Sequence, residues 1–367
     1  MIISRVRTLA RRSALWAAVL ALSGGLAAIL APATAQAAVP NAWAFALVLK
    51  SSGPVNASHW AESRPAPTPT AAPAGPGVVV VRFRNIGFFK GGTVHVTAVT
   101  DQYAWCQAQG WRTLGGSEYV TVRCFVKGGV ASFVPFTVTY SQSSGVLPGG
   151  LSYAYVSHGT TSGSSYNSTG HANTVTALGV GRWRVRLLGA GPATQSGGVQ
   201  LTAVATAPRI CDVAGRAQTH AAQFVFVDCY TKAGVRAASG WTLTYQRSRA
   251  ITGARPALFA YTVNNKPTFP GTYAPVPPAA NFNSTGATNT IGGGSPEALV
   301  LFPRVGVLAN IVFVTPAATV PRVCNLNTTW ATQPGPPRDV IVRDVVCYTP
   351  AGVLTRAVSY VTYVSRR

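Results

Sequence analysis

The sequence predicts an all-β protein made of three tandem β-sandwich repeats, immunoglobulin-like or jelly-roll-like, each with one internal disulfide. The first observation is a motif of cysteine, aromatic residue and Gly-Val turn that occurs three times, in 122–130, 227–235 and 345–353. The second is the period-two alternation of apolar and polar residues, which is typical of strands. The third is the even number of cysteines, 6 in all. A single threefold assembly of such units fits the same observations.

The repeat has a fixed register between its first two copies. An offset of 105 residues relates three pairs of landmarks, which are Cys106 and Cys211, Cys124 and Cys229, and Tyr140 and Tyr245. Several landmarks with one offset indicate duplication. From the second copy to the third, the offset is 113 for the first cysteine and 118 for the second. Five residues are therefore inserted in the third copy, and we place them within 327–339.

The N-terminal 37 residues have the pattern of a secretory signal peptide. A basic start precedes an apolar run, and Ala35-Gln36-Ala37 matches a small-x-small cleavage site. The Arg11-Arg12 pair lacks the usual twin-arginine surroundings, so we expect export by the general route. The predicted division of the chain is a signal peptide in 1–37 and repeats in 38–149, 150–252 and 253–367.

The cysteines are expected to form one bond within each repeat. Cys124 lies among valines on the inward face of an alternating strand, and the closing strands FTVTY (136–140) and WTLTY (241–245) alternate in the same way. Secreted proteins keep such bonds because their compartment is oxidising. The Gly-Val after the second cysteine predicts a hairpin turn into the closing strand. The expected pairs are Cys106–Cys124, Cys211–Cys229 and Cys324–Cys347.

Catalytic residues are scarce. The chain has 8 acidic residues and 5 histidines, and no acidic residue recurs at one position in all three repeats. Neither a metal-binding HExxH motif nor a G-x-S-x-G nucleophile elbow occurs, and we predict no cofactor and no metal site. His95 alternates with valines and is expected at the surface. An extracellular hydrolase with distant paired carboxylates is the catalytic alternative, and 334–340 is a candidate loop for a protease inhibitor.

Positive charge is the main functional observation, since 30 basic residues against 8 acidic ones give a net charge of +22. In 181–189 every second residue is arginine, which predicts one basic strand face. Guanidinium groups on such a face bind phosphate, sulfate or carboxylate through paired hydrogen bonds. Solubility alone is the other explanation of this charge. The candidate anion-binding residues are Arg82, Arg84, Arg182, Arg184, Arg186 and Arg304.

Two Asn-Ser-Thr-Gly segments, at 167–170 and 283–286, are predicted to form turns capped by the asparagine side chain. The same tripeptide is also a glycosylation acceptor, but we favour the turn. Together with the aromatic opening strand, the GGxVxxTAV segment and the paired cysteines, these motifs resemble repeats of secreted proteins from high-GC Gram-positive bacteria. That resemblance implies secretion and repetition and implies no activity.

We therefore expect an extracellular, non-catalytic binding or surface/matrix protein, with the cell wall as one place of attachment. Its expected partners are anionic polymers such as teichoic acid or acidic polysaccharide, and a nucleic acid is not favoured. The apolar segment 298–320 contains Pro303, Arg304 and Asn310, so no transmembrane span is expected. A structural protein whose repeats bind each other is a further alternative, and the oligomeric state stays open.

Overall fold

The computed structural model describes residues 42–366, apart from 62–66, 89, 148–151, 162, 192–196, 255, 257, 278, 294–296 and 336–337. The predicted signal peptide, 1–37, lies outside the described residues. The residues after Ala37 group into one compact unit. The three repeats therefore pack together and do not form separate domains. Within the described ranges, no helix has the length and apolar character needed to cross a bilayer.

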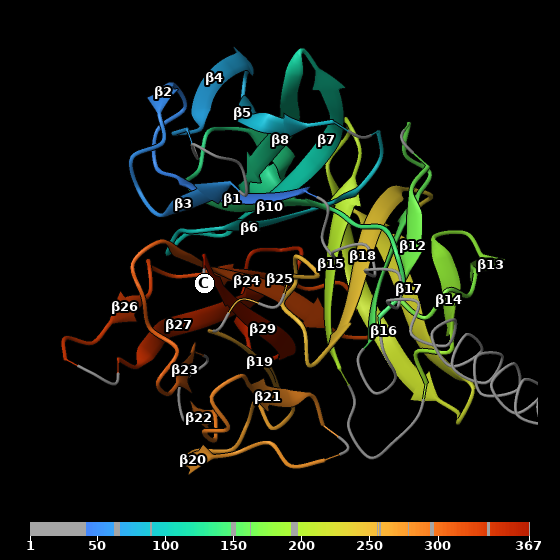
Figure 1. Cartoon of the computed structure of the whole chain (residues 1–367), viewed down its shortest axis with the longest axis vertical. Coiled ribbons are helices and arrows are strands. Elements are labelled where there is room, and N and C mark those ends of the chain that lie inside the picture. The colour runs from blue at the N-terminus through green and yellow to red at the C-terminus, as the bar shows by residue number, and fades with distance from the viewer. Residues whose placement is uncertain are drawn as a thin grey trace, which may run out of the picture. The chain divides into compact units, whose positions relative to one another are not determined.

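The described chain is almost entirely β, as predicted (Figure 1). Repeat 1 contains β1 Ala42–Val48, β2 Gly53–Pro54, β3 His59–Ala61, β4 Thr70–Gly75, β5 Val78–Gly87, β6 Thr93–Ala98, β7 Ala104–Leu114, β8 Gly116–Val126, a 3-10 turn Lys127–Gly129, β9 Val130–Ala131 and β10 Phe136–Gln142. Repeat 2 contains β11 Ser152–His158, β12 Ser165–Asn167, β13 Asn173–Gly179, β14 Arg182–Leu188, β15 Gly198–Val204, β16 Arg209–Gln218, β17 Ala222–Thr231 and β18 Gly240–Arg247. Repeat 3 contains β19 Phe259–Asn264, β20 Thr272–Tyr273, β21 Asn281–Asn283, β22 Thr290–Gly292, β23 Glu297–Phe302, β24 Asn310–Ala317, β25 Val323–Leu326, β26 Ala331–Thr332, β27 Val340–Tyr348, β28 Leu354–Thr355 and β29 Val358–Ser365.

Each repeat is a sandwich of two sheets. The inner sheet holds the aromatic opening strand beside the closing strand, in the orders β3-β1-β10-β6, β12-β11-β18-β15 and β21-β19-β29-β24. The outer sheet carries the cysteines, in the orders β4-β5-β8-β7, β13-β14-β17-β16 and β22-β23-β27-β25. Valine, alanine and aromatic side chains from both sheets fill the core between them. The three-repeat β-sandwich prediction is confirmed.

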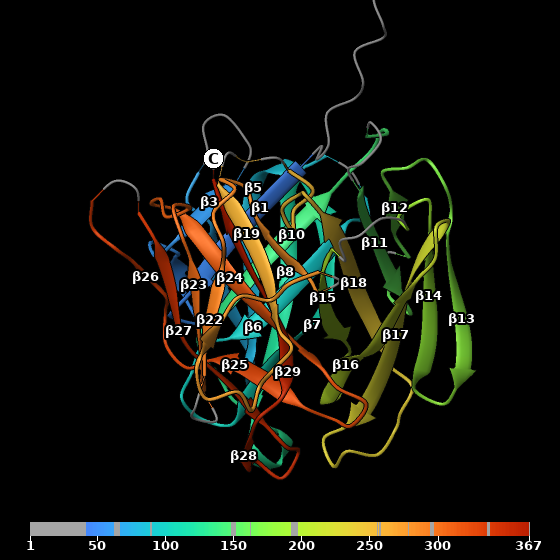
Figure 2. The same cartoon turned by 90° about the horizontal axis from the view of Figure 1, so that it is seen from below.

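The last strand of each inner sheet, β6, β15 or β24, lies against its counterparts from the other repeats (Figure 2). One threonine on each of these strands bonds the backbone of the neighbouring repeat. Three backbone amides donate to these hydroxyls, Val314 to Thr97 at 3.0 Å, Leu201 to Thr315 at 3.0 Å and Val96 to Thr202 at 3.2 Å. The three threonines hold equivalent positions, so the bonds close a ring around a pseudo-threefold axis.

A second ring involves the residue that follows the first cysteine of each repeat. Glutamine, aspartate and asparagine hold this position, and each bonds the backbone of another repeat. The amide of Arg209 donates to Gln107 Oε1 at 2.9 Å, the amide of Arg322 donates to Asp212 Oδ2 at 2.8 Å, and Asn325 Nδ2 donates to the Gln102 carbonyl at 3.2 Å. Three different side chains thus have one role, which is to join the repeats.

The expectation that His95 lies at the surface is wrong. This side chain is 1% exposed, because β15 and β18 of repeat 2 cover it. Its Nε2 lies 2.7 Å from the Thr244 hydroxyl, and its Nδ1 lies 3.3 Å from the Thr202 hydroxyl. Burial lowers the pKa of His95 to about 3. Alternation along one strand shows which residues share a face, but it does not show that another repeat covers that face.

The three predicted disulfides are present, Cys106–Cys124, Cys211–Cys229 and Cys324–Cys347. In each repeat the two cysteines lie opposite each other on antiparallel neighbours in the outer sheet. The separation is 18 residues in repeats 1 and 2 and 23 in repeat 3, in agreement with the predicted insertion. The Gly-Val turn forms a short hairpin, since β9 pairs with β8 and β28 pairs with β27. The expectation that it leads into the closing strand is wrong, because β10 and β29 belong to the inner sheets.

Removing one of these bonds should destabilise the protein measurably. A Cys211→Ala/Cys229→Ala variant is expected to lose about 3 kcal/mol of unfolding free energy, because its unfolded chain regains the entropy of an open loop. Denaturant unfolding of this variant and of the oxidised native protein measures the difference. Reduced native protein serves as the comparison in which all three loops are open. A loss under about 1 kcal/mol would contradict the loop-closure argument.

The two Asn-Ser-Thr-Gly segments form the predicted turns, with the same geometry in both repeats. Asn167 Oδ1 accepts from the Thr169 amide at 3.0 Å and from its hydroxyl at 2.7 Å. Asn283 Oδ1 accepts the same two bonds from Thr285, at 3.0 Å and 2.7 Å. Both asparagines are buried, and their amide nitrogens donate to backbone carbonyls. The amide nitrogen is thus engaged inside the turn, where an attached glycan would break these bonds.

Candidate anion-binding faces

The arginine ladder of repeat 2 lies along β14. Burial alternates on this strand, so that Arg182, Arg184 and Arg186 are exposed and the residues between them are buried. The neighbouring strands β13 and β17 pair with β14 on either side and hold it in the middle of the outer sheet. The guanidinium groups therefore project from a strand whose backbone is fixed on both edges.

Two phenylalanines of β17 share this face with the arginines. Phe224 pairs with Arg186 and Phe226 pairs with Arg184 across the strands, and both rings are half-buried. The Arg184 guanidinium lies 5.9 Å from the centroid of the Phe224 ring, a cation–π distance. The rings limit how far the arginine side chains move. We call Arg184, Arg186, Phe224 and Phe226 the repeat 2 face.

Repeat 1 has a related arrangement on β5 and β8. Arg82 pairs with Tyr119 across the strands, as Arg186 pairs with Phe224 in repeat 2. The Arg82 guanidinium lies 5.4 Å from the Tyr119 ring centroid, and that of Arg112, from β7, lies 5.9 Å from it. We call Arg82, Arg112 and Tyr119 the repeat 1 face.

The remaining two candidates lie apart from this arrangement. Arg84 is exposed near the end of β5. Arg304 is exposed in the turn after β23, with φ 61° and its amide donating to Asp339 Oδ1 at 2.9 Å. Its strand has Leu299 and Leu301 where β14 has arginines. Repeat 3 therefore has no arginine ladder on β23. Of the six candidates, Arg82 belongs to the repeat 1 face and Arg184 and Arg186 belong to the repeat 2 face.

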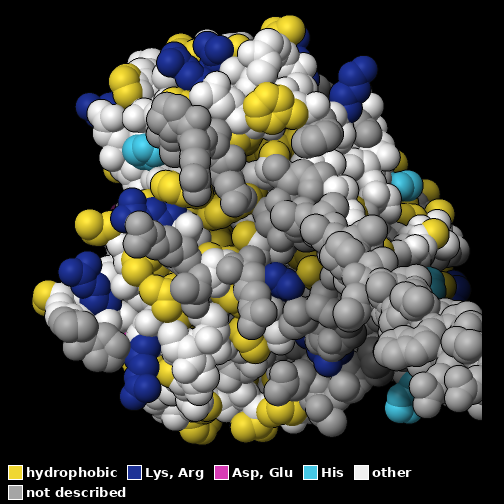
Figure 3. Space-filling model, viewed as in Figure 1, with side chains coloured by type: hydrophobic (Ala, Val, Ile, Leu, Met, Phe, Trp, Pro, Cys, Tyr) yellow, Lys and Arg dark blue, Asp and Glu magenta, His cyan; other side chains and the backbone are white. Residues whose placement is uncertain are grey.

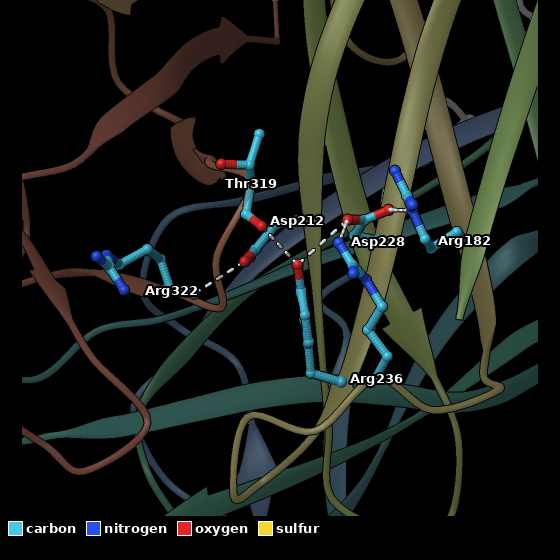
Figure 4. A network of polar contacts seen from close by, with 7 residues as sticks. Arg182, Asp212, Asp228, Arg236, Thr319 and Arg322 are labelled. Atoms are coloured by element: carbon cyan, nitrogen blue, oxygen red, sulfur yellow. Dashed lines mark hydrogen bonds and ion pairs between the residues drawn. The ribbon is translucent and has the colours of Figure 1, made fainter. Parts of the chain in front are cut away.

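The carboxylate of Asp228 neutralises Arg182, at one end of the repeat 2 ladder (Figure 4). Asp228 is paired with Arg182 at 3.4 Å and with Arg236 at 2.7 Å. The Tyr230 hydroxyl lies 3.3 Å from Asp228 Oδ2 and 3.1 Å from the carbonyl of Thr319 in repeat 3. Arg182 is thus engaged within the protein. Among the described residues, Asp228 is the only carboxylate in an ion pair, which leaves Arg184 and Arg186 without an acidic partner there.

Asp212 and Asp228 form a pair of neighbouring carboxylates beside the disulfide of repeat 2. Paired carboxylates carry out glycoside hydrolysis when they flank a cleft. Here Asp212 is fully buried, and burial raises its pKa well above the usual value. Asp228 is held by two guanidinium groups (Figure 4). Neither carboxylate faces an open cleft, so their geometry supports a structural role between repeats.

The chain matches no protein-family model, no curated protein and no solved structure. The inter-repeat residues and a groove between repeats 3 and 1 are the features that sequence reasoning missed. The residue after the first cysteine differs among the repeats, as Gln107, Asp212 and Asn325, and this difference hides the shared role. For the groove, no local pattern in the sequence connects Trp60 with Trp330.

Proposed function

We propose that the protein is a secreted, non-catalytic binding protein that holds anionic polymers through the repeat 1 and repeat 2 faces. The observation that supports this most is the repeat 2 face, where Arg184 and Arg186 are exposed beside two half-buried rings. A guanidinium group bonds a phosphate, sulfate or carboxylate through two parallel N–H donors. A rigid strand presents two such donors at a fixed spacing, which suits the repeated charges of a polymer.

Two faces on one compact unit would strengthen binding to a long chain. Once one face holds a polymer, the second face meets the same polymer at a high effective concentration. The partners we propose are acidic polymers of the cell envelope or the extracellular matrix. Three disulfides and the expected signal peptide support an extracellular location. No observation in the structure favours the hydrolase or the inhibitor, and the inhibitor loop, 334–340, lies partly outside the described residues.

The test is salt-dependent retention on an immobilised acidic polymer. We expect Arg184→Ala/Arg186→Ala to weaken retention and to reduce the slope of log affinity against log salt by about 2, one for each lost charge contact. Both positions are exposed, so the fold should be unaffected. The matched control is Arg338→Ala/Arg343→Ala, which removes the same charge from exposed positions in repeat 3.

An equal loss in both double variants would show that only net charge matters and would contradict the proposal. Retention of reduced, heat-unfolded protein to the same extent as the folded protein would contradict it too. Retention that falls with salt for the folded protein alone, and falls further in Arg184→Ala/Arg186→Ala, is the expected result.

A further inference from the structure

A cavity lies where repeat 3 meets repeat 1. Its volume is about 680 Å³, within the range of ligand sites. Repeat 1 contributes residues around β3, and repeat 3 contributes residues that precede β24 and β26. Figure 3 shows hydrophobic side chains gathered between these two parts of the surface, with basic side chains beside them. We call this cavity the junction groove, lined in part by Leu49, His59, Trp60, Leu308, Trp330 and Arg366.

The two tryptophans of the junction groove are held by different contacts. Trp60 lies on β3 opposite Phe45, and its ring centroid is 6.5 Å from that of Trp43. Trp330 directly precedes β26 of repeat 3, and its indole N–H donates to Asn310 Oδ1. The backbone amide of Asn310 donates in turn to Ser58 Oγ at 2.7 Å. Hydrogen bonds between the repeats therefore hold this wall of the groove.

Polar groups are present at both sides of these rings. His59 Nδ1 lies 2.8 Å from the Ala57 carbonyl oxygen. Because a carbonyl oxygen only accepts hydrogen bonds, Nδ1 carries the proton, and Nε2 is an acceptor when the ring is neutral. The Arg366 guanidinium lies 5.9 Å from the Trp60 ring centroid. No aspartate or glutamate is among the described residues that line the cavity. The groove therefore combines flat apolar surfaces, one hydrogen-bond acceptor and a positive charge.

At the other two junctions, the described residues place different groups around the position of Trp60. Tyr166 and Phe282 hold the position of Trp60, as the strand register shows. The Tyr166 hydroxyl donates to the Gly145 carbonyl at 3.0 Å, so the segment that connects repeats 1 and 2 covers that ring. In the segment that connects repeats 2 and 3, Ala250 and Ile251 are fully buried. In the described part of the chain, connecting segments thus fill space at two junctions. Repeats 3 and 1 are not consecutive and meet through direct contacts, such as the bond from the Thr100 amide to the Leu326 carbonyl at 2.8 Å.

We propose that the junction groove binds an acidic glycan, a sugar chain that carries uronate carboxylates. The C–H groups on the face of a pyranose ring pack against the negative face of an indole, and Trp60 and Trp330 offer two such surfaces. Arg366 would pair with the carboxylate, and His59 Nε2 would accept from a sugar hydroxyl. A lipid would leave these polar groups unpaired. This site shares no residue with the arginine faces and does not depend on them.

Calorimetric titration of the oxidised full chain with a short oligouronate tests the proposal, with the carboxyl-reduced neutral oligomer as the comparison. We expect saturable binding of one oligouronate per molecule and weaker binding of the neutral oligomer. Trp330→Ala should weaken the binding of both oligomers about tenfold, since one stacking surface is lost. Arg366→Ala should remove the preference for the acidic oligomer.

A further variant separates loss of binding from loss of folding. Leu308 is 72% exposed on the groove rim, so Leu308→Asp should leave the fold intact while its charge repels the oligouronate. The control is Arg338→Ala/Arg343→Ala, which removes two exposed charges outside the groove and outside both arginine faces and should leave this titration unchanged. Loss of binding in Arg184→Ala/Arg186→Ala, but not in Leu308→Asp or Trp330→Ala, would place the sugar on the repeat 2 face and overturn the proposal. Equal binding of the acidic and neutral oligomers, or no saturable binding of either, would also overturn it.

Discussion

His95→Gln should make the protein more resistant to acid than the native protein. The folded-state pKa of His95 is about 3, far below the usual value near 6.5. Below pH 6.5 the imidazole of His95 binds a proton in the unfolded chain but stays neutral in the folded protein. The free energy of unfolding therefore falls as the pH falls. Between pH 6.5 and pH 3 the difference between the two pKa values lowers the free energy of unfolding by about 5 kcal/mol. At pH 8 the ring is neutral in both states, and the native protein keeps its full stability.

Repeat 2 supplies the reason to choose glutamine. Gln200 holds the position of His95, and its Nε2 donates to the Thr362 hydroxyl at 2.8 Å, as His95 bonds Thr244. The variant should therefore have nearly native stability at pH 8. Chemical unfolding of both proteins at pH 8 and pH 4 measures the difference, in which the other titrating groups cancel. An identical loss in both proteins between these pH values would show that the buried imidazole does not govern acid sensitivity.

Glu118→Gln should stabilise the protein at alkaline pH. Glu118 lies in the core of repeat 1 and is fully buried, and burial raises its pKa from 4.5 to about 7. Between these values the unfolded chain releases its proton first, so stability falls as the pH rises. Above pH 7 the loss amounts to between about 3 and 4 kcal/mol. Below pH 4.5 both states are protonated, and the variant should match the native protein.

Glutamine keeps the existing bond, because the Thr113 hydroxyl donates to Glu118 Oε2 at 2.8 Å and can donate equally to an amide oxygen. Thermal unfolding at pH 4 and pH 8.5 measures the effect. The expected result is a higher melting temperature for the variant at pH 8.5 alone. A lower melting temperature at both pH values would mean that the ionised carboxylate stabilises the core. The costs of His95 and Glu118 overlap between pH 4.5 and pH 6.5, and their sum is nearly constant there and smaller than at lower or higher pH.

The sandwich repeats could be predicted because their signals are local. Cys106 and Cys124 belong to one hairpin, so their pairing follows from the repeat. The ladder from Arg182 to Arg186 follows from alternation within one strand. These features depend on residues close in sequence, and duplication shows them more than once.

The arrangement of the repeats could not be predicted, because many contacts between them join residues more than 100 positions apart. His95 looks like any alternating strand residue until Thr202 and Thr244 of another repeat cover it. Asp212 looks like an isolated acid until the Arg322 amide is placed against it. The junction groove depends on Trp60 and Trp330, which no periodic pattern connects.

The hydrogen bonds between the repeats close a ring, so the chain resembles a trimer of one repeat whose three copies are linked in a single polypeptide. In a trimer of identical chains, every axial position would hold the same residue three times. Covalent linkage releases that restriction, and the position of His95 holds Gln200 in repeat 2 and Phe313 in repeat 3. The molecule can therefore place one imidazole near its axis and one tryptophan-lined groove at one junction, where a symmetric trimer would have three of each or none.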